Sequence, residues 1–192
     1  MKRVLLHCCC APCSCSIIEF MQKNRMDPTV FFYNPNIHPA GEYEIRKNEI
    51  IRYARQMNAP FVDADYDASR WFDLTRGFEN EPEKGRRCDL CFELRLSRAA
   101  EYACQNGFHI VTTSLGISRW KDFDQVTAAG IRAVKEVRSR HRGAVLKYWA
   151  YPWRKKGGSD RMAEISKREN FYRQIYCGCL YSLQQAAARR KA

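Results

Sequence analysis

The sequence predicts one α/β domain built around a mostly parallel sheet. Its 192 residues are 45% hydrophobic, which is enough apolar surface to bury a single core. Short β-rich runs alternate with amphipathic segments over the first 115 residues, a pattern typical of βαβ units. The sequence contains no internal repeat and no low-complexity segment. We therefore divide the chain into one α/β domain at residues 1–182 and a basic tail at residues 183–192.

The strands are predicted from short runs rich in β-branched and aromatic residues. The first, at residues 3–7, ends before Pro12, which opens a helix at residues 13–24. The other predicted strands are residues 29–34, 60–66, 109–114 and 145–151. Residues 34–43 contain two prolines and two asparagines, so this segment is predicted to have no regular structure.

The helices are predicted from apolar residues that recur every three or four positions. In residues 42–57 the apolar face consists of Tyr43, Ile50, Ala54 and Met57. In residues 88–105 it consists of Phe92, Leu96, Ala99 and Ala103, and Gly107 ends that helix. Further helices are predicted at residues 68–75, 121–140 and 159–169, and the segment from Leu180 is at most a frayed helix.

The chain is strongly basic, with 33 Lys and Arg against 21 Asp and Glu and a net charge of +12. The excess forms four clusters, which are Arg86–Arg87, Arg138–Arg142, Arg154–Lys156 and Arg189–Lys191. Such a surplus predicts salt-sensitive attraction to a polyanion, most naturally a nucleic acid. The alternative is a solvated basic surface that has no such partner.

The amino terminus has too few apolar residues for a secretory signal, and no later stretch approaches about 18 uninterrupted apolar residues. We therefore expect a cytoplasmic protein without membrane contact. In a reducing compartment the ten cysteines are not expected to form a disulfide framework. Metal binding or redox chemistry explains them better.

Cys88 and Cys91 are predicted to lie one turn apart on the same face at the start of a helix. The helix N-terminus, with Arg86 and Arg87 just before it, favours the thiolate form that binds metals. Taken alone, this spacing is equally consistent with two half-buried structural cysteines.

Cys8, Cys9 and Cys10 are consecutive, and neighbours in an extended strand point to opposite faces. Two of them can share a metal site only where the strand ends, and Pro12 supplies that end. Ligands of parallel sheets gather beyond the carboxyl ends of the strands, where nucleotide-binding folds place a glycine-rich phosphate loop. This chain has cysteines there and no phosphate loop, so ATP chemistry is disfavoured. Two adjacent cysteines with the Cys88 pair make four thiolates, which suit either zinc or an iron–sulfur cluster.

Two further cysteine pairs indicate redox chemistry. A disulfide between Cys177 and Cys179 closes a small, strained ring and is easily reduced. The alternative for this pair is two free thiols or two more metal ligands. Cys10 and Cys13 resemble the CxPC motif of thioredoxins, although thioredoxin-like proteins reach that motif only after an earlier strand and helix. Cys15 and Cys104 are predicted to be packing residues.

The segment HCCCAPC is followed in order by NPNIHPAGEYEIRKNE, DADYDASRWF, EPEKGRRCDLCFELRLSRAA, TTSLGIS and FYRQIYCGCLYS. Together these motifs resemble the cobalamin-independent epoxyqueuosine reductases, the QueH family, and the resemblance extends to about Ser182. It implies removal of the epoxide oxygen from epoxyqueuosine at the wobble position of tRNA, which leaves a cyclopentene. It also implies a doubly wound α/β fold of the adenine-nucleotide alpha hydrolase (HUP-like) type.

The resemblance further implies a [4Fe-4S] cluster with an additional mononuclear iron beside it. The cluster ligands would be Cys9, Cys10, Cys88 and Cys91, and the redox-active disulfide would join Cys177 and Cys179. Candidate ligands of the extra iron are Cys13 and Asp67. Candidate proton donors are His7, Tyr176 and Asp67, and candidate stacking aromatics are Tyr33, Trp71 and Trp120, each of which has a structural role as its alternative. The implied partners are a tRNA with epoxyqueuosine in a GUN anticodon and an electron donor of unknown identity.

Two other hypotheses use the same cysteines. In the first, four thiolates bind zinc and staple a tRNA-binding module that has no chemistry. In the second, Cys10 and Cys13 make the chain a thiol–disulfide oxidoreductase. Iron and sulfide content distinguishes the first from an iron–sulfur enzyme, and a disulfide-reductase activity that survives the loss of Cys88 identifies the second.

Overall fold

The computed structural model describes residues 2–191, and the side chains of residues 189–191 lie outside that description. The predicted basic cluster Arg189–Lys191 therefore falls outside the described side chains. The strands are β1 Lys2–His7, β2 Met26–Phe32, β3 Phe61–Asp63, β4 Ile110–Thr113 and β5 Lys147–Tyr148. They form one sheet in the order β3-β2-β1-β4-β5, and every adjacent pair is parallel, as predicted.

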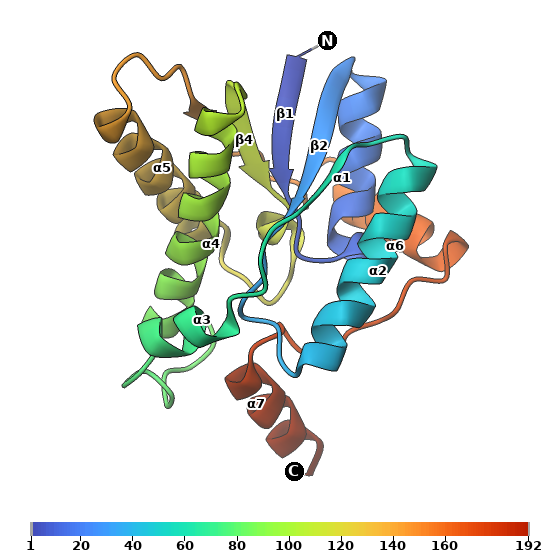
Figure 1. The fold of residues 1–192 in the computed structure, drawn as a ribbon. Helices are drawn as coiled ribbons and strands as arrows, with labels where there is room; N and C mark the ends of the chain where they lie inside the picture. Colours follow the sequence, from blue (N-terminus) through green and yellow to red (C-terminus); the bar gives the residue numbers. More distant parts are fainter. Residues whose placement is uncertain (1, 192) are drawn as a thin grey trace.

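The helices alternate with these strands. They are α1 Ala11–Lys23, α2 Ala40–Gln56, α3 Ala68–Leu74, α4 Arg86–Gln105, α5 Phe123–Arg140, α6 Gly158–Arg168 and α7 Leu180–Lys191, with a 3₁₀ turn η1 at Leu115–Ile117. Helices α4 and α5 cover one face of the sheet, and α1, α2 and α6 cover the other (Figure 1). The doubly wound arrangement is thus confirmed.

The chain reverses its direction of winding at β1. The first crossovers run from β1 through β2 to β3, and the later ones run from β4 to β5 on the opposite side of β1. Such a reversal opens a crevice at the carboxyl ends of the two central strands, and ligands of open α/β sheets bind there. Helices α3 and α7 lie beyond this same edge (Figure 1).

Several predicted boundaries differ from the structure, and the largest differences involve α2, β2, β3 and β5. Helix α2 begins at Ala40, inside the segment predicted to be irregular, because Pro39 stands in an extended conformation just before the first turn and no helical N–H is lost there. Strands β3 and β5 are shorter than predicted, since each lies at an edge and pairs on one side only.

The predicted apolar stripes form the core. Phe92, Leu96, Ala99 and Ala103 of α4 are buried, as are Tyr43, Ile50 and Ala54 of α2. Met57 follows the end of α2 and is half-buried. Cys15 is buried in the same core and Cys104 packs against it, so their predicted packing role is confirmed. Within residues 2–191, no helix has the length and apolar character needed to span a bilayer.

Candidate functional site

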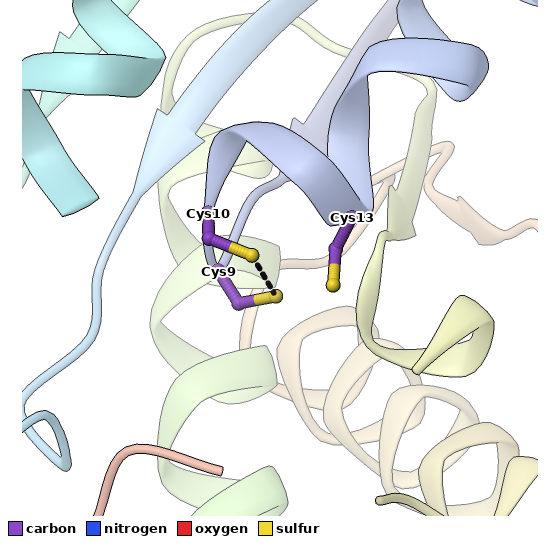
Figure 2. Close-up of side chains that lie close together, drawn as sticks. All are labelled: Cys9, Cys10 and Cys13. Atoms are coloured by element: carbon purple, nitrogen blue, oxygen red, sulfur yellow. Dashed lines mark hydrogen bonds between the residues drawn. The ribbon is translucent and has the colours of Figure 1, made fainter. Parts of the chain in front are cut away.

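Three cysteine sulfurs meet where β1 gives way to α1. Cys9 and Cys10 follow β1, Cys13 stands in the first turn of α1, and their Sγ atoms all lie within 4.8 Å of one another. Figure 2 shows the three sulfurs directed toward the same space, with 3.7 Å between the Sγ atoms of Cys9 and Cys10. Cys10 caps the helix in an extended conformation, and Pro12 follows in the first turn. The break predicted after the first strand therefore exists and brings adjacent cysteines together.

The cysteine turn is anchored to the neighbouring strands. The Cys9 amide donates to Ser114 Oγ, just after β4, at 3.2 Å. Asn34, which follows β2, donates its Nδ2 hydrogen to the Cys8 carbonyl at 2.9 Å. The Arg95 guanidinium of α4 donates in turn to the Asn34 side-chain oxygen. Residues from three parallel strands and one helix thus fix this turn at the crevice.

Both ring nitrogens of His7 form hydrogen bonds within the protein. Its Nε2 lies 3.1 Å from the Tyr33 carbonyl oxygen. A carbonyl can only accept a hydrogen bond, so Nε2 carries the hydrogen of the neutral ring. Nδ1 then accepts a hydrogen bond from the Thr113 hydroxyl at 2.8 Å. Burial, followed by the charge of Arg95, lowers the pKa of His7 to about 3. A neutral imidazole with both nitrogens occupied holds strands together, and it is a poor candidate for the proton donor considered above.

A second group of four cysteines consists of Cys88, Cys91, Cys177 and Cys179. Cys88 and Cys91 occupy the first turn of α4, and Cys91 packs with Cys179 against buried Trp71. Burial raises the pKa of Cys88 to about 12, with contributions from the nearby Cys91, Cys177 and Cys179. The predicted CxxC and CxC pairs are therefore neighbours. The structure contains no disulfide between Cys177 and Cys179.

Two buried cations, Arg95 and Lys121, interact electrostatically with cysteines of both groups. Burial raises the pKa of Cys91, and the positive charge of Arg95 opposes that rise. The same charge lowers the pKa of Cys9. Burial disfavours the charged form of Lys121, yet Cys177, Cys9 and Cys13 raise its pKa. The neighbouring thiols of Cys10 and Cys13, with both cations, hold the pKa of Cys9 well below its usual range. The two cysteine groups thus face a common pair of positive charges.

The CxC loop is held by another buried cation, Arg46 of α2. Arg46 pairs with Glu42 at 2.6 Å and donates to the carbonyls of Cys177 at 3.0 Å and Tyr176 at 3.4 Å. Gly178 has a φ of +141°, and a Cβ there would lie 3.2 Å from Arg46 Nη1. Glycine is therefore required between the two cysteines by its backbone conformation and by close packing.

Arg87 corrects one expectation drawn from charge. The sequence places it in a basic cluster, but its side chain is buried and donates to the carbonyls of Phe78, Glu79 and Glu81. The polar loop before α4 has no regular structure to satisfy these carbonyls, and the guanidinium does so instead. Arg86 remains exposed.

Other predicted site residues have local structural roles. The Asp67 carboxylate accepts the Arg70 amide hydrogen at 3.3 Å and caps α3. The Tyr176 hydroxyl donates to the His38 carbonyl. Tyr33 and Trp71 are buried, whereas Trp120 is half-buried.

A pocket of about 530 Å³ opens beside Cys13. Its lining includes Trp120, Tyr172, Gln174 and three exposed arginines, which are Arg119, Arg154 and Arg173. Arginines and an accessible aromatic ring suit a ligand that has both a phosphate and a base. A ligand in this pocket would lie beside Cys13.

Sequence reasoning missed several residues of this site. It indicated Cys13 as a candidate ligand for an extra iron and as half of a CxPC pair with Cys10, but not as a third sulfur grouped with Cys9 and Cys10, and nothing pointed to Gln174 or Lys121. Arg46 was detectable, because Glu42 stands four residues earlier on the same helix. Arg95 offered no such signal, since its partner Asn34 is 61 residues away.

Comparisons with known proteins agree with this geometry. The family model for epoxyqueuosine reductase QueH matches residues 4–185. Curated relatives named epoxyqueuosine reductase QueH include those of Acinetobacter baylyi, 54% identical over 95% of this chain and 81% of the relative, and Histophilus somni, 52% identical over 100% and 76%. The relative from Haemophilus influenzae is 52% identical over 96% and 73%.

A solved structure shares the fold. It is the U34-tRNA thiolase NcsA from Methanococcus maripaludis with its [4Fe-4S] cluster, with a TM-score of 0.57 and 10% identity. The match covers 99% of this chain and 65% of that one, so this chain spans less than two thirds of the thiolase. The likeness is one of fold, and it agrees with the predicted α/β architecture around a parallel sheet.

Proposed function

Because this chain belongs to the epoxyqueuosine reductase QueH family, we propose that it removes the epoxide oxygen of epoxyqueuosine at the wobble position of tRNA. The enzyme is an oxidoreductase of queuosine biosynthesis. Conversion of an epoxide to an alkene and water consumes two electrons and two protons. The observation that carries the proposal is the set of buried thiols beside a pocket lined by arginines and Trp120.

Four cysteine thiolates are the usual ligands of a [4Fe-4S] cluster, and the two cysteine groups can supply them. We assign its ligands to Cys9 and Cys10 at the end of β1 and to Cys88 and Cys91 at the start of α4. The buried cations Arg95 and Lys121, which interact with cysteines of both groups, would offset the negative charge of a thiolate-bound cluster. When bound, such a cluster supplies electrons one at a time. The relatives' family and the cluster in the thiolase NcsA are consistent with this assignment.

Cys13 is the third sulfur of the first group and is left over by this ligand set. We propose that it is the protein ligand nearest to any additional mononuclear iron. Asp67 receives no support for that role, because its carboxylate caps α3.

Cys177 and Cys179 provide the right number of electrons and protons. Oxidation of two thiols to a disulfide releases two electrons and two protons, which equals the amount that epoxide removal consumes. Both thiols are free and lie near Cys88. We propose that this dithiol is oxidised to the disulfide once per turnover and is then reduced again, either by two external thiols that leave as a disulfide or by a one-electron donor that acts twice while two protons are taken up.

The tRNA with its GUN anticodon would bind on the basic side of the pocket. Arg154 lines the pocket, and Lys155 and Lys156 are exposed beside it. Phosphate contacts from these cations would hold the anticodon loop while the wobble base enters beside Cys13.

Alanine at Arg154, Lys155 and Lys156 together is expected to weaken tRNA binding. The slope of log K against log salt should fall by about 1 for each phosphate that the variant no longer neutralises. Binding measured over a range of salt concentrations checks this. Alanine at Arg138, Arg140 and Arg142, which lie around the end of α5, is the matched control and should leave the slope near its original value. An unchanged slope in the first variant would show that these charges face only solvent.

The decisive experiment is anaerobic measurement of iron and sulfide together with turnover of epoxyqueuosine-tRNA. We expect about four irons and four sulfides per chain for one cluster, and an alkene product. Zinc without sulfide would instead support a stapled tRNA-binding module. The pKa of Cys10 disfavours the thiol–disulfide oxidoreductase. A hydrogen bond with Cys13 lowers this pKa, but the hydrogen bond with Cys9 and burial outweigh it and raise the pKa to about 12. Reactive redox cysteines have lowered pKa values.

A further inference from the structure

Gln174 contacts both the sulfur group and the pocket. It lies in the irregular segment between α6 and α7, and its Nε2 donates to Cys10 Sγ at 3.0 Å. The same side chain lines the pocket beside Cys13. Its other polar atom, Oε1, is buried and has no hydrogen-bond partner among the described residues.

The chemistry of sulfur fixes which end of the amide faces Cys10. A thiolate, or a sulfur bound to a metal, has no proton to donate and can only accept. Nε2 must therefore face the sulfur, and Oε1 is directed away from it. A buried acceptor without a partner is unfavourable, so a ligand that brings a donor to Oε1 gains from satisfying it.

We propose that Gln174 is a positioning residue that links Cys10 to the bound substrate. Its Nε2 hydrogen bonds to the Cys10 sulfur, and its Oε1 accepts a hydrogen bond from a hydroxyl or amino group of the modified nucleoside. This inference rests on the proposed function, because it takes Cys10 as a cluster ligand and a nucleoside as the occupant of the pocket.

Each half of the proposal has its own consequence. Hydrogen bonds to ligand sulfurs stabilise the more negative, reduced state and raise the reduction potential of an iron–sulfur cluster. Loss of the Nε2 donor should therefore make the potential more negative, even without substrate. Loss of the Oε1 acceptor should raise KM, because the substrate donor loses its buried partner.

Two variants separate the two atoms of the amide. Gln174→Leu removes donor and acceptor, whereas Gln174→Glu keeps an acceptor and removes the donor at similar size. Gln105→Leu is the control, since Gln105 is exposed at the end of α4 and contacts Glu101. The reduction potential is measured by a spectroscopic redox titration of each anaerobic holoenzyme without tRNA. KM and kcat are measured with epoxyqueuosine-tRNA.

We expect both Gln174 variants to have a more negative potential than the wild type and the control. Gln174→Leu should also raise KM about tenfold, the effect of losing one hydrogen bond to a buried group, and Gln174→Glu should raise it less. A Gln174→Leu enzyme with unchanged potential and unchanged KM would overturn this inference alone. A wild-type protein without cluster or turnover would overturn the proposed function and the inference with it.

Discussion

Replacement of Cys88 by serine is expected to abolish the cluster and the turnover together. Serine keeps the size and the helical position of the residue but cannot supply a thiolate, so one of four assigned ligands is removed. Cys88 is half-buried in the first turn of α4, and the fold should therefore survive. The measurements are iron and sulfide content, visible absorbance and reduction of epoxyqueuosine-tRNA.

Two further serine variants make this experiment discriminating. Cys13→Ser should retain the cluster, because Cys13 lies outside the assigned ligand set although its sulfur is within 4.8 Å of those of Cys9 and Cys10. Cys104→Ser, outside both cysteine groups, should retain cluster and activity. If Cys13→Ser lost the cluster while Cys88→Ser kept it, the three sulfurs of Figure 2 would be the ligands and Cys88 would be removed from the set.

Substitution of Arg46 by methionine is expected to lower the free energy of unfolding by about 3–5 kcal/mol, the usual effect of removing one partner from a buried ion pair. The side chains of Arg46 and Glu42 are only 2% and 8% exposed. The variant would leave Glu42 buried without its cation and would also strip the Cys177 carbonyl of its donor. The CxC loop should consequently become mobile.

Arg52→Met is the matched control for this experiment, because Arg52 lies on the same helix. Arg52 also forms an ion pair, with Glu169, but its side chain is 49% exposed. That pair is expected to contribute less than about 1 kcal/mol. Chemical denaturation of both variants under the same anaerobic conditions gives the comparison. An equal decrease in the two variants would mean that the buried pair contributes no more than a surface one.

The fold was predictable from local sequence patterns. Alternation of β-rich runs and amphipathic helices, with stripes such as Phe92 to Ala103, defines a parallel α/β sheet without any tertiary information. The start of α2 was not predictable in this way, because Pro39 breaks a helix when it is internal but is compatible with a position just before the first turn.

The site was predictable only where its functional residues are neighbours in the sequence. Pro12 after a run of cysteines indicated the break that brings Cys9 and Cys10 together. The convergence of Arg95, Lys121 and Gln174 on those sulfurs depends on how helices and loops from distant parts of the chain pack. Arg87 was wrongly predicted to belong to an exposed basic cluster, because composition does not distinguish a buried arginine from an exposed one.

The position of β1 in the sheet has a consequence for local unfolding of the protein. This strand is paired on both sides, with β2 and with β4, so its amides should be among the slowest to exchange their hydrogens with solvent. The segment carrying Cys177 and Cys179 has no such ladder and should open far more readily. The assigned ligands Cys9 and Cys10 follow this protected strand, whereas the dithiol of Cys177 and Cys179 lies in one of the least protected segments. The order in which these two sets of sulfurs lose their surroundings on unfolding is then set by chain topology.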